Sequence, residues 1–164
     1  MKKLIRTIAF ILLLSVLIAP ATAFADKGAA AAAFTQYLDQ KDVIYTYQGK
    51  TDSGKDRVKI SYDCENTSLT AQFVFDTDDE AVAVYIFNLY EARYSQIDDC
   101  KKLCNDMNAK YRFVKFYLDE KDNTITVQAD AIFRSHDIGD ICYELLLRSL
   151  DIADEAYPSF AELG

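Results

Sequence analysis

Four cysteines are the residues of this chain with the most obvious capacity for chemistry. Cys100 and Cys104 lie four residues apart, so on a helix they would share one face, and parallel side chains at that spacing make a disulfide strained. A bridge to Cys142 is easier if the helices that carry these residues touch, and burial as free thiols, Cys64 included, is the open alternative. Zinc binding with His136 would have the right ligand types at an unusual spacing, so we expect a structural role and no metal.

Ser135, His136 and Asp137 are the three residue types of a hydrolytic triad in a row. Consecutive side chains do not point at one another as a triad requires, so the order carries no catalytic meaning. Ser135 or Asp137 is better placed to begin a helix. We therefore predict no catalytic residue.

Two acidic segments fall where the pattern indicates hairpin turns. Carboxylates in turns are usually solvated, which is the reading we favour. Two alternatives remain: a weak calcium site of an envelope protein, although neither segment matches the EF-hand loop, and a small secreted hydrolase that uses these carboxylates. The acidic residues are Asp76, Asp78, Asp79, Glu80, Asp119, Glu120 and Asp122.

An aromatic strand at residues 111–118 is the best candidate for a binding surface. Val114, Phe116 and Leu118 alternate with a second set, and only the first set is needed to cover a core. The second set would place aromatic rings on an open sheet face, where proteins often meet proteins. We predict Tyr111, Phe113 and Tyr117 as partner-binding residues, with coverage by a helix or tail as the alternative. Lys115 lies among them.

The elements that position these residues follow from hydrophobic periodicity. The predicted order is αββββαββα, an antiparallel sheet flanked by helices of the α+β class. In the fourth strand both alternating sets are apolar, which predicts a central strand covered on both faces. The predicted helices span 26–41, 95–110 and a segment from Asp137 to its stop at Pro158, and the strands lie at 43–48, around 58–62, 69–75, 81–89, 111–118 and 124–133.

Residues 1–25 have the pattern of a secretory signal peptide. Lys2, Lys3 and Arg6 precede an apolar run, and Ala23-Phe24-Ala25 provides a small-residue cleavage site. A retained membrane anchor is the alternative, but the apolar run is shorter than a spanning helix needs. We expect cleavage after Ala25 and a secreted or periplasmic protein.

Size and charge restrict the remaining possibilities. Of 164 residues, 51% are hydrophobic, and cleavage would leave 139, which is one domain (26–164) with a real core. The net charge is −8, and losing three basic residues with the signal peptide makes it −11. This balance disfavours nucleic acid and anionic membranes as partners.

The segment from Asn105 to Asp119 resembles the helix-to-strand crossing of YbjN-like domains. Two asparagines, Asn105 and Asn108, lie near the end of a helix, and the strand Phe113-Val114-Lys115-Phe116 and an acidic turn follow. The resemblance implies a fold like that of class I type III secretion chaperones and implies no enzymatic activity. The family is largely thought of as cytoplasmic, so the predicted signal peptide is a departure.

Together these patterns predict a non-enzymatic extracytoplasmic module that binds a protein partner or acts as a chaperone. The partner is not specified by the sequence and could be a second copy of the chain. We expect no cofactor.

Overall fold

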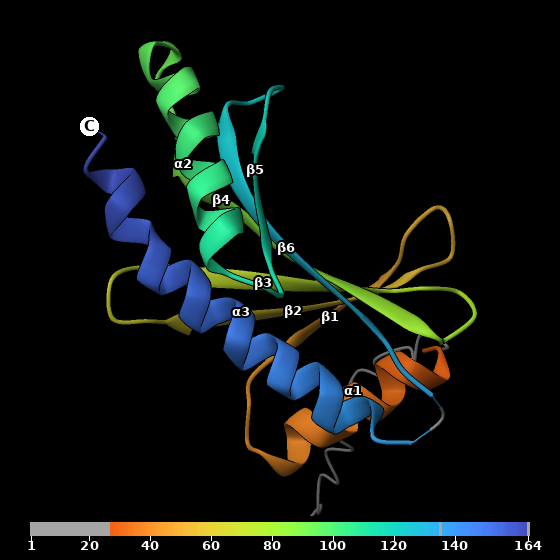
Figure 1. Cartoon of the computed structure of the whole chain (residues 1–164). Helices are drawn as coiled ribbons and strands as arrows, with labels where there is room; N and C mark the ends of the chain where they lie inside the picture. The colour runs from red at the N-terminus through yellow and green to blue at the C-terminus, as the bar shows by residue number, and fades with distance from the viewer. Residues whose placement is uncertain (1–26, 135, 164) are drawn as a thin grey trace, which may run out of the picture.

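The computed structural model describes residues 27–134 and 136–163 (Figure 1). The predicted signal peptide and Ser135 therefore lie outside the described residues. Within the described ranges, no helix is both long enough and apolar enough to cross a membrane.

The predicted order αββββαββα is confirmed, with one short 3-10 turn added before the second helix. The second strand keeps the clear alternation of buried and exposed residues that the sequence shows. The elements are α1 (Ala29–Gln40), β1 (Thr46–Lys50), β2 (Asp56–Asp63), β3 (Ser68–Phe75), β4 (Ala81–Glu91), η1 (Tyr94–Gln96), α2 (Ile97–Lys110), β5 (Lys115–Asp119), β6 (Thr124–Ile132) and α3 (Ile138–Ala161).

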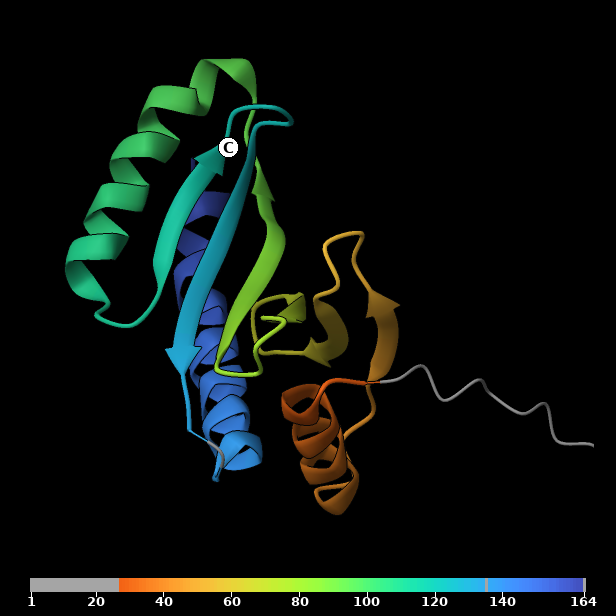
Figure 2. The same cartoon turned by 90° about the vertical axis from the view of Figure 1, so that its right-hand side faces the viewer.

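The six strands form one antiparallel sheet in the order β1-β2-β3-β4-β6-β5. Helix α3 crosses one face of this sheet and contacts β3, β4 and β6, while α1 contacts β2 and α2 contacts β5. In Figure 2, α3 lies behind β4, β5 and β6, and the opposite face of these strands is turned toward the viewer. We call the face under the helices the core face and the other the open face.

The register aligns buried apolar residues of the central strands on the core face. Val58, Phe73 and Val84 are aligned partners across β2, β3 and β4, and all three are buried. Phe34 of α1 packs on this row, with its ring centroid 4.5 Å from that of Phe73. Burial of these large apolar side chains is the main stabilising contribution to the fold.

Two carboxylates hold the beginning of α1. The backbone N–H groups of Ala29 and Ala30 donate to Asp79 at 3.0 Å, and that of Gly28 donates to Asp56 at 3.0 Å. Helix α1 has no acidic residue in its own first turn, so these two carboxylates satisfy free donors at its start and complement its dipole.

Helix α3 continues through Pro158 to Ala161, so the predicted stop at that proline is wrong. A proline inside a helix lacks the N–H that would bond the carbonyl four residues earlier. Here the carbonyl of Asp154 instead accepts the side-chain amide of Asn66 at 3.2 Å. The turn between β2 and β3 therefore replaces the missing donor, and the helix passes the proline.

Candidate functional site

The open face is the surface that the helices leave uncovered. Along β4, Val82, Val84 and Ile86 are buried on the core face, whereas Tyr85 is half-buried and Phe87 is 46% exposed on the other. The prediction that this strand is covered on both faces is therefore wrong. Its central position in the sheet is confirmed by the strand order.

Three aromatic side chains gather on the open face, and we call Tyr85, Phe87 and Tyr117 the aromatic cluster. The rings of Tyr85 and Phe87 stack at 5.2 Å with an interplanar angle of 9°. Tyr117 comes from β5, across the intervening strand β6, and is 37% exposed. Partial burial, followed by the neighbouring hydroxyl of Tyr85, raises the pKa of Tyr117, so the hydroxyl stays protonated and can donate at neutral pH.

Polar side chains surround the aromatic cluster. One transverse row of aligned residues runs from β2 to β5 through Lys59, Gln72, Tyr85, Gln128 and Lys115. An aromatic centre with a polar and basic rim has the composition of protein-binding surfaces.

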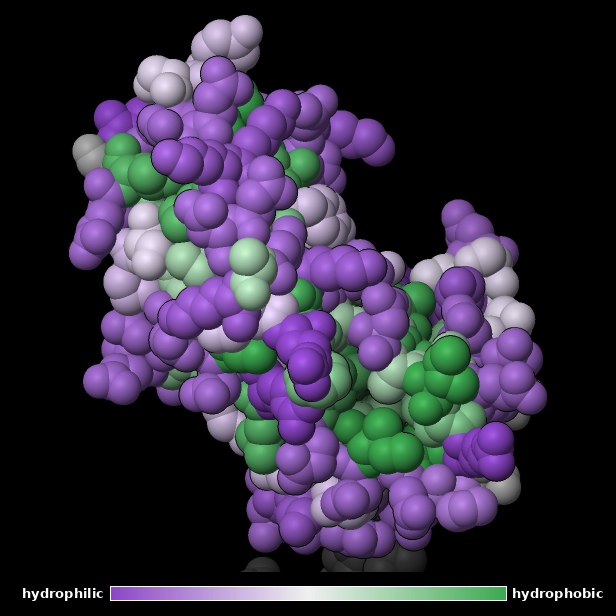
Figure 3. Space-filling view, in the orientation of Figure 1, coloured by the Kyte–Doolittle hydropathy of each residue, from purple (hydrophilic) through white to green (hydrophobic). Residues whose placement is uncertain are grey.

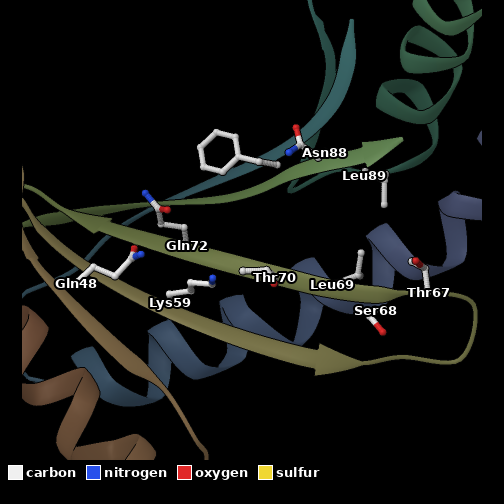
Figure 4. A pocket seen from close by; sticks show the side chains of 10 residues that line it. Gln48, Lys59, Thr67, Ser68, Leu69, Thr70, Gln72, Asn88 and Leu89 are labelled. Carbon is white, nitrogen blue, oxygen red and sulfur yellow. The ribbon is translucent and has the colours of Figure 1, made fainter. Parts of the chain in front are cut away.

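A cavity of about 340 Å³ lies on this face where β3 and β4 separate. Figure 4 shows Gln48, Lys59 and Gln72 on three neighbouring strands, and Asn88 on β4 also lines the cavity. Asn88 has a φ of 55°, a left-handed conformation, and it sits in an irregularity of the β4–β6 pairing between Ile86 and Tyr90. Such bulges re-aim side chains, and this one turns Phe87 and Asn88 to the cavity wall.

Tyr111 does not belong to the open face, contrary to the prediction. It follows the last turn of α2, where its N–H donates to the carbonyl of Met107, and β5 begins only at Lys115. Its ring is partly buried and lies 6.1 Å from that of Phe116 on the core side. Strand alternation did not apply because Tyr111 lies four residues before the first paired residue of β5.

Phe113 is 57% exposed, as predicted, but it faces a different neighbour. The guanidinium of Arg148 on α3 lies 4.7 Å from the centroid of its ring. Phe113 and Arg148 line a separate cavity of about 310 Å³ between α3 and the end of β6. Of the three predicted residues, only Tyr117 is part of the aromatic cluster.

Sequence reasoning missed Tyr85 and Phe87 because an apolar strand looks covered when it is considered alone. The signal that could have found them lies in the adjacent strands. Lys59 and Gln72 align with Tyr85 on the same face, and a polar row beside a tyrosine indicates an open surface.

All four cysteines are free thiols. Cys100 and Cys104 are buried on α2, which contacts the C-terminal part of α3: Lys110 pairs with Glu155, and Gln96 donates to Leu163. Cys142 lies more than three turns before Glu155, about 20 Å along the helix, so the bridge considered between these elements is excluded. Desolvation raises the pKa of Cys104 and of Cys142 to about 12.

The acidic segments are engaged in turns and caps. Asp76 pairs with Lys55 at 2.5 Å, Glu120 with Lys101 at 2.6 Å, and Asp122 accepts the N–H of Thr124. Asp79 caps α1, as described above. Within residues 27–134 and 136–163, no three His, Cys, Asp or Glu side chains converge on a point that could hold a metal ion.

The residues before α3 form the start of that helix. Asp137 stands at the N-cap position with a φ of 67° and makes no capping bond through its side chain, while its carbonyl accepts the N–H of Ile141. His136 is exposed beside it. Asp137 therefore begins the helix through its backbone.

A second apolar surface lies where α1, the end of β6 and the start of α3 meet (Figure 3). Its lining includes Ala29, Ala33 and Ile132, the last of which is 85% exposed. It is separate from the aromatic cluster and carries the carboxylates of Asp78 and Asp79 at its rim.

Known proteins share the family and the fold of this chain. The family model "YbjN: Putative bacterial sensory transduction regulator" matches residues 31–162. A crystal structure described as YbjN, "a putative transcription regulator from E. coli", superposes with a TM-score of 0.56 at 14% identity, covering 77% of this chain and 87% of that one. No curated protein sequence matches.

The matched residues include the segment around Asn108, and the structure explains what that asparagine does. Its side-chain amide donates to the carbonyl of Phe116 at 2.9 Å, and its oxygen accepts the N–H of Phe116 at 2.7 Å. Asn108 thus occupies the outer edge of β5 as another strand would, which fixes α2 against the sheet. With the family model spanning most of the sequence, the chain belongs to the YbjN family.

Proposed function

We propose that this protein is a non-enzymatic, extracytoplasmic binding module that holds a protein partner on the open face of its sheet. The observation that carries the proposal is the aromatic cluster on a face that none of the helices of residues 27–134 and 136–163 covers. Aromatic side chains at the centre of a polar rim supply most of the binding energy in many protein interfaces.

The carboxylate chemistry that a hydrolase needs has no support at this site. The lining of the cavity includes amides, hydroxyls and one lysine, and no acidic residue. Asp56 and Asp79, which approach each other around Gly28, are engaged by backbone N–H groups of α1. A binding role therefore accounts for more of the described residues than catalysis does.

A partner protein suits this face better than a second copy of the chain. Lys59 and Lys115 stand at opposite ends of the row through Tyr85. A two-fold axis through the centre of that row would bring lysines of two copies together, at a cost in repulsion. The overall charge of −8 likewise opposes self-association.

Photo-crosslinking tests the proposal. A benzophenone amino acid at Phe87 or Tyr117 should yield a discrete adduct in the native envelope or culture fluid, and excess unlabelled protein should suppress it. The matched control is the same probe at Leu147, an apolar residue of similar exposure on α3. The absence of an adduct from positions 87 and 117, or the same adduct from 147, would refute the open face as the binding site.

Export is tested separately by sequencing the N-terminus of the native protein. A start at Asp26, outside the cytoplasm, is the expected result of cleavage after Ala25. A native protein that begins at Met1 or Lys2 would instead support a retained anchor.

A further inference from the structure

We propose that the gap between β3 and β4 binds an extended segment of the partner polypeptide as an added β-strand. We call this gap the strand fork and define it by residues 68–70 on β3 and 87–89 on β4. The inference rests on the proposed function and specifies the form in which the partner binds.

The strand fork presents two backbone edges without a strand between them. From the hairpin onward, β3 and β4 are paired from Phe75–Val82 to Ala71–Ile86, and there the pairing ends. Residues 68–70 continue to pair with β2 on their other side. The left-handed Asn88 redirects β4, whose pairing with β6 resumes at Tyr90. Strand edges that lack a paired neighbour are the template for strand addition.

Helix α3 holds the two sides of the strand fork apart. Before β3, Asn66 and Thr67 donate their N–H groups to the buried carboxylate of Asp154, both at 3.0 Å. At the end of β4, the ring of Tyr90 stacks on Phe160 at 6.2 Å.

These two anchors on α3 are six residues apart, which is about 9 Å along a helix. Neighbouring strands lie about 4.8 Å apart, so the anchors are separated by about two strand spacings. The opening therefore suits one inserted strand, and it is formed before any partner arrives.

The side chains around the strand fork suit a polypeptide of low charge. Among the residues that line its cavity, Lys59 is the one charged residue, in a chain with 26 acidic residues. The amides of Gln72 and Asn88 make no hydrogen bond to any described residue, so both remain able to bond a partner. Phe87 offers a half-exposed ring for one apolar side chain. A single-stranded nucleic acid would require several cations along its path, which this cavity does not supply.

The probe is a peptide selected from a phage-displayed library of random 12-residue peptides by binding to the purified protein. We expect enriched peptides that bind the wild type and lose at least tenfold in affinity to Thr70→Trp, whose indole would fill the strand fork. Ser68→Trp, also within the strand fork, serves the same purpose if Thr70→Trp does not fold, as judged by circular dichroism. The control is Leu147→Ser, an exposed position on α3 away from the open face, which should change peptide affinity by less than twofold.

Amide hydrogen exchange locates the bound peptide. Exchange at residues 68–70 and 87–89 should slow at least tenfold in the complex if the peptide pairs with these backbones. Protection elsewhere, wild-type affinity in both tryptophan variants, or no enriched peptide would overturn strand addition. The crosslinking experiment at Phe87 and Tyr117 tests the open-face proposal independently, so strand addition can fail while the open face is still confirmed as the binding site. Binding of oligothymidine (dT12) in place of peptide would overturn the assignment of a polypeptide.

Discussion

The two faces of β4 look alike in the sequence and differ completely in the fold. Ile86 and Phe87 are adjacent and comparably apolar, yet Ile86 is 1% exposed and Phe87 is 46% exposed. On the core face, α3 supplies neighbours to β4, while on the open face the aligned residues of β3 and β6 are polar. Apolar character on both sides of a strand therefore does not reveal which side is covered.

Strand β5 shows the same contrast between a buried and an exposed face. Phe116 is buried between Tyr111 and Phe160, while the next residue, Tyr117, joins the aromatic cluster. Adjacent positions on one strand thus serve stability and, in our proposal, binding.

The largest expected effect comes from the core face. Phe116→Ala should lower the free energy of unfolding by about 3 to 5 kcal/mol, because it removes contacts with two rings and leaves a cavity. Chemical denaturation followed by circular dichroism measures the loss. A loss no greater than that of Tyr117→Ser would contradict the difference between the two faces.

Cys104→Ser should cost about 1 to 3 kcal/mol, because a hydroxyl replaces a thiol at a buried site shaped for sulfur. Thermal melting would show the loss, and Cys64→Ser, at a half-buried turn, is the control with a smaller expected effect. Equal melting temperatures for the Cys104 variant and wild type would show that the site tolerates the hydroxyl.

The same thiols predict a pH dependence. A thiol pKa raised from 9.0 to about 12 keeps Cys104 and Cys142 protonated at pH 8 in the folded protein. Their thiolate fraction is then about a thousandfold below that of an unfolded thiol, and labelling by an aromatic disulfide should be slow until denaturant is added. The unfolded state releases the thiol protons first as pH rises, so this contribution to stability is complete below about pH 9 and lost between 9 and 12. Rapid labelling of all four cysteines at pH 8 would contradict the burial.

Asn108→Ala tests whether this side chain closes the edge of β5, in contrast to the strand fork, whose edges are open. Loss of both bonds to Phe116 should lower stability by about 1 to 2 kcal/mol and should speed amide exchange at Phe116. Asn108→Asp can accept from the N–H of Phe116 but cannot donate to its carbonyl. Its stability should therefore fall between those of the wild type and Asn108→Ala. An unchanged exchange rate at Phe116 would show that this side chain does not close the edge.

The smallest effect should come from the open face. Tyr85→Ser and Phe87→Ser should each lower stability by no more than about 1 kcal/mol, because both rings are only half-buried, while reducing the crosslinking yield at position 117. A loss in stability comparable to that of Phe116→Ala would mean that this face is structural.

The sequence by itself determined the order of the elements and the family. Period-two alternation in β2, helical spacing in α2 and the turn residues between strands are local properties, and they do not depend on where the chain finally packs. The segment around Asn108 was specific for the same reason, since its asparagine bonds a strand only eight residues away.

Only the tertiary structure decided which side chains gather. Tyr111 was assigned to the wrong face because strand alternation was extended past the true start of β5. Tyr85 and Tyr117 are 32 residues apart, and the strand order β4-β6-β5 places them two strands apart on one face, an arrangement that local spacing does not encode. The strand fork likewise depends on Asp154 and Phe160 of α3 holding the turn before β3 and the end of β4 apart, and such long-range contacts exist only once the chain has folded.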